Sequence, residues 1–122
     1  MMMREREYLT KPDQYALVYE KGSSWISGLV VMKALPNGLS WSRYGFSVSR
    51  RVGKAVVRNR VKRRLREILR SAPVGPGWDI IFIARPPAAA AGFASLKKSV
   101  QGLLSQAGLL TREYEKAYLS IN

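Results

Sequence analysis

The sequence predicts an α+β fold, a small sandwich of a mixed sheet with helices on one face. Three segments show the apolar spacing of helices, while GLVVM and DIIFIA are apolar runs of strand length. The order of these elements, α-β-β-α-β-α, is typical of helices packed against a short sheet. We expect a single domain over residues 1–122, with flexible ends at 1–8 and 111–122.

The first element is a helix near the N-terminus. Thr10 is a candidate N-cap for it, and Gly22 follows its last turn. Tyr15 and Tyr19 are four residues apart and therefore share one face of this helix. From this spacing alone, the two tyrosines either close the core or present an aromatic surface to a ligand.

A β-hairpin is expected next. Residues 24–35 are rich in β-branched side chains and predict one strand, and Asn37-Gly38 is a common hairpin turn. Residues 40–49 alternate well enough to form the partner strand, with Phe46 on the same face as Tyr44.

The second half of the chain predicts a helix, a strand and a helix. A basic helix begins near Gly53 and is broken by APVGPG at 72–77, after which WDIIFIAR forms a buried strand. The Ala-rich connector PPAAAAG is expected to be a loop or a helix entry, followed by a helix over 92–106. The tail after residue 110 predicts a short terminal helix.

The basic helix lies within residues 50–70, where ten of 21 residues are Lys or Arg and Glu67 is the one acid. At about 100° per residue, one arc of this helix is apolar and packs on the sheet, so that the remaining surface is cationic. The apolar arc contains Val57, Val61, Leu65, Ile68 and Leu69. Like charges four residues apart disfavour the free helix, by a total of about 1–2 kcal/mol at low salt.

A polyanionic ligand explains this charge better than solvation does, because a solvated helix would mix Glu with Lys. The net charge of +13 supports the same conclusion. Eight of the ten cations are Arg, which favours bidentate contacts to phosphates and hence nucleic acid. An anionic membrane is disfavoured, because the apolar face of the helix is small and aliphatic and is needed for the core. The turn at 47–53 predicts a phosphate site at the start of the helix, with Arg50, Arg51 and Lys54 beside it.

Composition narrows the chemistry that the chain can perform. The absence of Cys and His excludes disulfides, zinc sites built from thiolate or imidazole, and imidazole-based catalysis. The eight acids are scattered over several elements, so we expect neither a catalytic nor a metal site on the protein. No apolar run reaches the roughly 20 residues of a membrane span, and no signal peptide is evident, so we expect a cytoplasmic protein.

Three segments together carry a resemblance to a known family. GFSVSRRVGKAVVRNRVKRRLRE closely resembles the Arg-Asn-Arg motif region of the bacterial ribonuclease P protein subunit. LTKPDQYALVYEKG is similar to the first helix of that family, and WDIIFIARPPAA to its strand followed by Ala-Arg-x-Pro-Ala. The resemblance covers most of residues 9–104. It implies a left-handed βαβ crossover and the fold that the family shares with the second domain of a small-subunit ribosomal protein.

The resemblance also implies a function. In this family a ribonucleoprotein endonuclease removes the 5′ leader of precursor tRNA, and the RNA subunit carries the Mg²⁺-dependent chemistry. The chain would be its RNA-binding domain, with ribonuclease P RNA and precursor tRNA as partners, Mg²⁺ bound on the RNA, and no membrane or small-molecule substrate.

Individual roles follow from the matched positions. The motif helix is expected to contact the catalytic RNA or the region near the cleavage site through Arg58, Asn59, Arg60, Lys62, Arg63 and Arg66. Stacking on an unpaired base contributes about 1–3 kcal/mol, and the family's aromatic positions on the first helix imply a cleft for the single-stranded leader. The cleft would contain Tyr15 and Tyr19, with Lys33 and the half-buried Phe46 in its floor.

Two other classes of protein fit part of the pattern. A structural ribosomal protein would use the arginine face for rRNA but would not need the two tyrosines. A sequence-specific DNA binder is disfavoured, because a hairpin rather than a short helix-turn-helix partner precedes the basic helix.

Overall fold

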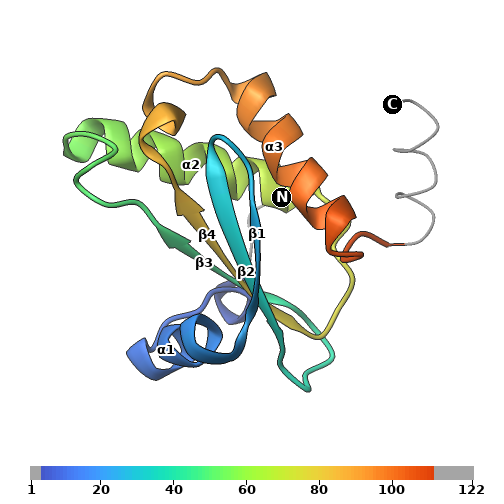
Figure 1. Cartoon of the computed structure of the whole chain (residues 1–122). Helices are drawn as coiled ribbons and strands as arrows, with labels where there is room; N and C mark the ends of the chain where they lie inside the picture. The colour runs from blue at the N-terminus through green and yellow to red at the C-terminus, as the bar shows by residue number, and fades with distance from the viewer. Residues whose placement is uncertain (1–3, 112–122) are drawn as a thin grey trace.

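A computed structural model describes residues 4–111 as a four-stranded mixed sheet with helices on both of its faces (Figure 1). The strand order is β1-β2-β4-β3. β1 and β2 pair antiparallel, as do β2 and β4, whereas β3 and β4 are parallel. The strands are β1 (Ser23–Ile26), β2 (Val30–Pro36), β3 (Arg43–Ser47) and β4 (Trp78–Ala84).

The predicted strand over 24–35 is in fact two strands. The hydroxyl of Ser27 accepts hydrogen bonds from the N–H groups of Leu29 and Val30, at 3.3 and 3.1 Å, and this turn folds β1 back on β2. The predicted pairing of 24–35 with 40–49 is also wrong, because β4 lies between β2 and β3. The element order is therefore α-β-β-β-α-β-α.

The helices cover two faces of the sheet rather than the one that was predicted. α1 (Pro12–Lys21) lies on one face, and α2 (Ala55–Ser71) and α3 (Phe93–Gln106) lie on the other (Figure 1). The reason is the apolar character of β4 on both sides. Phe82 packs in the larger core with α2 and α3, while the neighbouring Ile81 packs with Val18 of α1, and all three side chains are 0% exposed.

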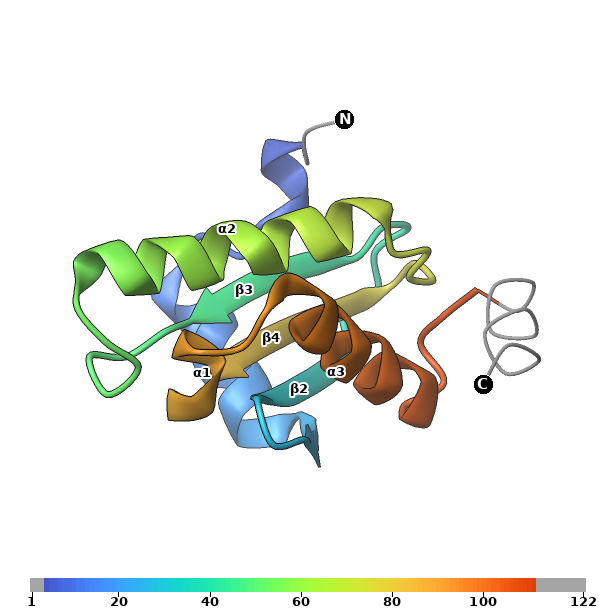
Figure 2. The ribbon, with the colours of Figure 1, turned by 90° about the horizontal axis from the view of Figure 1, so that it is seen from above.

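The predicted apolar arc of α2 is confirmed. Val61, Leu65, Ile68 and Leu69 are buried against the sheet, and Val57 packs at the edge of the same core. Figure 2 shows α2 running lengthwise along β3, with β4 on the other side of that strand, and the β3-α2-β4 connection is left-handed. The predicted α+β class and its unusual crossover are therefore both present, against the general right-handed preference.

The N-terminal segment is part of the fold from residue 5. A 3₁₀ turn, η1 (Glu5–Glu7), precedes Tyr8, which pairs with Tyr44 of β3, and the N–H of Leu9 donates to the carbonyl of Tyr44 at 2.8 Å. The Ala-rich connector forms a second 3₁₀ turn, η2 (Pro86–Ala89), which matches the expected helix entry. The expected flexible end and terminal helix at 112–122 lie outside the described residues, as do residues 1–3.

Candidate nucleic-acid interface

The outer surface of α2 is cationic along its length. Asn59, Arg63 and Arg66 are exposed, and Arg58 and Lys62 are partly exposed along one edge of the helix. We name these five residues the α2 face. Glu67 pairs with Arg70 one turn further on, so it does not neutralise the α2 face.

The loop before α2 extends this surface. Arg50, Arg51 and Lys54 are all exposed, and an open hollow of about 520 Å³ is lined by Arg50, Lys54 and Arg58. Gly53 has a φ of 156°, and a Cβ there would lie 3.0 Å from the side chain of Val57, so the loop can close tightly on the first turn. The first N–H groups of a helix have no intrahelical acceptor. The hollow therefore has the charge and the donors that a phosphate requires.

Arg60 is placed differently from the other predicted RNA contacts. Its Nη2 donates to the carbonyl of Ala89 at 3.1 Å, and Arg64 donates through Nη1 to the carbonyl of Ala91 at 2.9 Å. Both arginines thus hold the Ala-rich connector against α2. The Nε atoms of Arg58 and Arg60 are buried without a hydrogen-bond partner among the described residues. The sequence does indicate this difference, because the helical wheel puts Arg60 and Arg64 on the opposite edge of α2 from Arg58 and Lys62.

The other face of the sheet carries the two tyrosines. Tyr15 is half-buried and Tyr19 is 40% exposed. Lys33 lies on the same side of the sheet, because it pairs with Ile81, whose side chain packs against α1. We name Tyr15, Tyr19 and Lys33 the α1 face. Burial raises the pKa of Tyr15; a backbone hydrogen bond at Phe46 opposes this rise, and the nearby Tyr19 adds to it.

Gly45 positions Tyr15 on this face. A Cβ on Gly45 would lie 2.7 Å from both Cε1 and the hydroxyl of Tyr15, closer than real Cβ contacts. The phenol ring therefore rests directly on the backbone of β3, which only glycine permits at this position.

The prediction that Phe46 floors the same cleft is wrong. Phe46 pairs with Phe82 in the register of β3 and β4, and their rings stack with centroids 6.4 Å apart in the larger core, on the α2 side. Because successive strand residues face opposite sides, Gly45 faces α1 while Phe46 faces α2.

The described residues contain no group of three or more His, Cys, Asp or Glu side chains that could hold a metal ion. Within the same part of the chain, no helix has the length and apolar character needed to cross a membrane.

Comparison with known proteins identifies the family. Residues 3–108 match the family model described as Ribonuclease P. The Ribonuclease P protein component of Dehalococcoides mccartyi (strain CBDB1) is 46% identical over 114 residues, covering 93% of this chain and 95% of that protein. The component from Roseiflexus castenholzii is 44% identical over 111 residues, covering 88% and 91%.

Solved structures agree with the sequence relatives. The Staphylococcus aureus RNase P protein superposes with a TM-score of 0.79 at 30% identity, covering 86% of this chain and 98% of that one. The Thermotoga maritima RNase P protein gives a TM-score of 0.71 at 30% identity, covering 85% and 94%. The chain therefore belongs to the bacterial ribonuclease P protein family.

Proposed function

We propose that this chain binds ribonuclease P RNA through the α2 face and the loop before it, and binds the 5′ leader of precursor tRNA on the α1 face. In this way it assists the Mg²⁺-dependent endonucleolytic removal of the leader. The observation that carries the proposal is the outer surface of α2, which presents cations along its whole length in a member of this family.

The α2 face suits a folded RNA. Its cations displace condensed counterions from RNA phosphates, which supplies affinity without reading sequence. The guanidinium groups of Arg63 and Arg66 are exposed and can each bind a phosphate through two N–H groups. The hollow beside Lys54 adds a site where helix N–H groups and side-chain cations act on one phosphate.

The α1 face suits an unpaired strand. Tyr19 offers an exposed ring for stacking, and Lys33 places a cation on the adjacent strand. Tyr15 is fixed over Gly45, so its ring loses little freedom when a base binds. The leader would then run along α1 while the body of the RNA lies against α2.

Mg²⁺ belongs to the RNA in this proposal. The described residues do not provide a cluster of carboxylates for a resident metal, and no step is assigned to a metal on the protein. The contribution of the chain is charge: its surplus of cations, +13 overall, lowers the repulsion between RNA phosphates that Mg²⁺ would otherwise have to screen.

Reconstitution with the cognate RNA tests the proposal. Cleavage of precursor tRNA is measured against Mg²⁺ concentration, with and without protein, for a long and a short leader. The protein should lower the Mg²⁺ requirement and favour the long leader, and protein alone should cleave nothing. A structural rRNA-binding protein, the alternative, would change neither quantity, and that result would overturn the proposal.

A further inference from the structure

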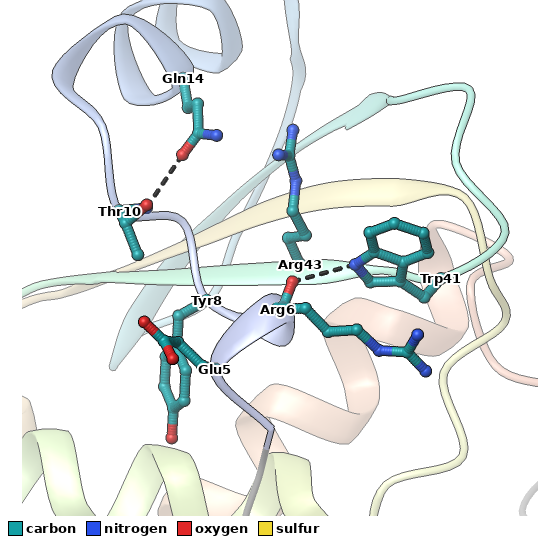
Figure 3. A pocket seen from close by; sticks show the side chains of 7 residues that line it. All are labelled: Glu5, Arg6, Tyr8, Thr10, Gln14, Trp41 and Arg43. Carbon is teal, nitrogen blue, oxygen red and sulfur yellow. Dashed lines mark hydrogen bonds between the residues drawn. The ribbon is translucent and has the colours of Figure 1, made fainter.

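An open hollow lies beside the start of β3 and the first turn of α1 (Figure 3). It has a volume of about 610 Å³, and its lining includes Glu5, Arg6, Tyr8, Gln14, Trp41 and Arg43. Figure 3 shows Gln14, Arg43 and Trp41 on one side of the β3 ribbon, with Glu5 and Tyr8 at the opposite rim. We name this the N-terminal hollow.

An aromatic ring in the hollow is held in place before any ligand binds. The indole N–H of Trp41 donates to the carbonyl of Arg6 at 2.9 Å, and the guanidinium carbon of Arg6 lies 5.1 Å from the centre of the Trp41 ring. Arg6 is exposed, so its guanidinium can leave the ring without opening the core.

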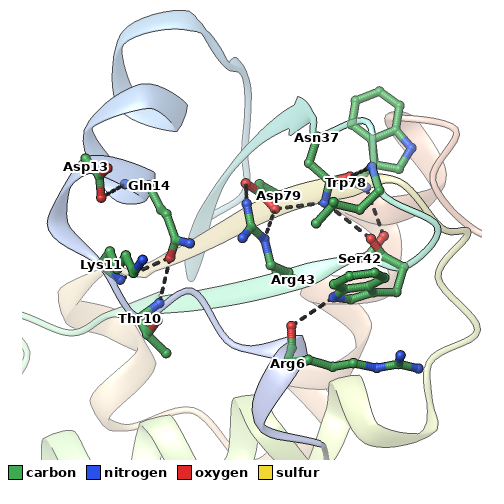
Figure 4. A network of polar contacts seen from close by, with 12 residues as sticks. Arg6, Thr10, Lys11, Asp13, Gln14, Asn37, Ser42, Arg43, Trp78 and Asp79 are labelled. Carbon is green, nitrogen blue, oxygen red and sulfur yellow. Dashed lines mark hydrogen bonds and ion pairs between the residues drawn. The ribbon is translucent and has the colours of Figure 1, made fainter.

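Hydrogen-bond donors in the hollow are also fixed. Arg43 donates through Nε and Nη2 to the two carboxylate oxygens of Asp79, at 2.8 and 2.7 Å, and Asn37 donates to the same carboxylate at 2.9 Å (Figure 4). Asp79 is only 4% exposed. The hydrogen bond to Asp79 raises the pKa of Arg43 further. Because these bonds use Nε and Nη2, the Nη1 donors of Arg43 are left for a ligand.

Gln14 is oriented by a similar arrangement. Its side-chain oxygen accepts from the N–H groups of Thr10 and Lys11, at 2.9 and 3.0 Å, and its side-chain NH₂ group is thereby left as a donor. Glu5 supplies an acceptor at the rim. A planar ring with both donors and acceptors on its edge is the chemistry that these groups recognise.

Charge distinguishes a base from a phosphate as the ligand. Around the hollow, Arg6 and Arg43 are offset by Glu5 and the paired Asp79, so the site carries little net charge. Stacking of a nucleobase on an aromatic ring changes affinity by about 5- to 150-fold, whereas an exposed cation–π contact contributes about 2- to 5-fold. A base therefore displaces the guanidinium of Arg6 from Trp41.

The position of the hollow continues the α1 face. Arg43 is two residues before Gly45 on the same side of β3, about 7 Å along the strand, and Tyr15 rests on Gly45. We propose that the N-terminal hollow is a second leader site, which binds one unpaired nucleobase of RNA against Trp41 with Arg43 and Gln14 as donors. This inference rests on the proposed function, because it extends the same strand of RNA beyond Tyr15.

The test measures the affinity of the reconstituted ribonucleoprotein for precursor tRNAs whose leaders grow by one nucleotide at a time. The parent complex should gain affinity in a step at the length that reaches the hollow. Trp41→Leu should lose that step, by about five-fold or more, and bind shorter leaders like the parent. Because no charge is removed, the dependence of affinity on salt should not change.

Two further variants separate stacking from a structural role. Trp41→Phe keeps an aromatic ring but lacks the N–H that holds Arg6, and it should retain the step. Phe93→Leu removes an exposed aromatic on α3, 39% exposed, and serves as the matched control without effect. Unfolding in urea confirms that each variant is folded.

The outcomes distinguish the inference from the proposed function. A step that survives in Trp41→Leu, or that is lost equally in Trp41→Leu and Trp41→Phe, overturns the hollow as a base site. Affinity of the parent complex that does not depend on leader length at all overturns the proposed function itself.

Discussion

At the scale of single residues, Gly45 determines how the α1 face is built. Replacing it with Ala puts a methyl group 2.7 Å from the ring of Tyr15, which must then move off β3. We expect Gly45→Ala to cost about 1–3 kcal/mol of unfolding free energy, the usual range for overpacking, measured by urea denaturation. In the background Tyr15→Leu the same change should cost less; equal costs would show that the contact is not responsible.

Arg60 and Arg63 are neighbours in sequence with different expected roles. Arg60→Gln removes the charged donor to Ala89, so we expect a loss of about 1–3 kcal/mol in stability and an unchanged salt dependence of RNA affinity. Arg63→Gln should leave stability unchanged and lower the slope of log affinity against log salt by about 1. A fall in slope for Arg60→Gln equal to that for Arg63→Gln would contradict this division.

Tyr44 gives the folded protein a sensitivity to alkaline pH. Burial, assisted by the negative charge of Glu7, raises the pKa of Tyr44 above its ordinary value of 10.0. Above about pH 10 the unfolded chain loses this proton and the folded chain keeps it, so stability should fall as the pH rises. Urea unfolding between pH 9 and 11 measures this slope, and Tyr44→Phe should make it shallower; an identical slope in the variant would refute the assignment.

At the scale of elements, α2 is stabilised by its apolar side and destabilised by its charges. Arg58, Lys62 and Arg66 form a row of like charges at i,i+4 spacing, so phosphate or sulfate should raise the melting temperature of the free protein. Lys62→Glu replaces two repulsive pairs with attractive ones. We expect it to raise stability by about 0.5–1 kcal/mol and to reduce the effect of salt, whereas a salt effect of parental size would argue against repulsion as its cause.

The elements also show what the local pattern of a sequence can and cannot predict. The face of α2 was predictable because helical periodicity and packing depend on the same residues, such as Val61 and Leu65. The pairing of β3 with β4 was not predictable. It joins Arg43 to Asp79, which are separated in the sequence by the whole of α2, so no local pattern indicates it. The division of β1 from β2 depends on the side chain of Ser27, and Ser27-Gly28 was the available turn signal.

At the scale of the whole molecule, the sheet separates the α2 face from the α1 face. α1 and α2 lie on opposite sides of the sheet (Figure 1). The α2 face therefore presents its cations on one side, and the α1 face presents its tyrosines on the other. Two predicted residues lie elsewhere: Phe46, whose side of β3 follows from its register with Phe82, and Arg60, which holds the Ala-rich connector. A strand as apolar on both faces as DIIFIA was the available sign that helices cover both sides.

The most direct test of this account compares precursor tRNA with mature tRNA. Tyr19→Ala is the suitable variant, because Tyr19 is exposed while Tyr15 also packs on Gly45. In the reconstituted complex, Tyr19→Ala should weaken affinity for leader-bearing precursor by about five-fold or more and leave affinity for mature tRNA unchanged. Equal affinities of parent and variant for the precursor, or an equal loss for both substrates, would contradict leader binding on the α1 face.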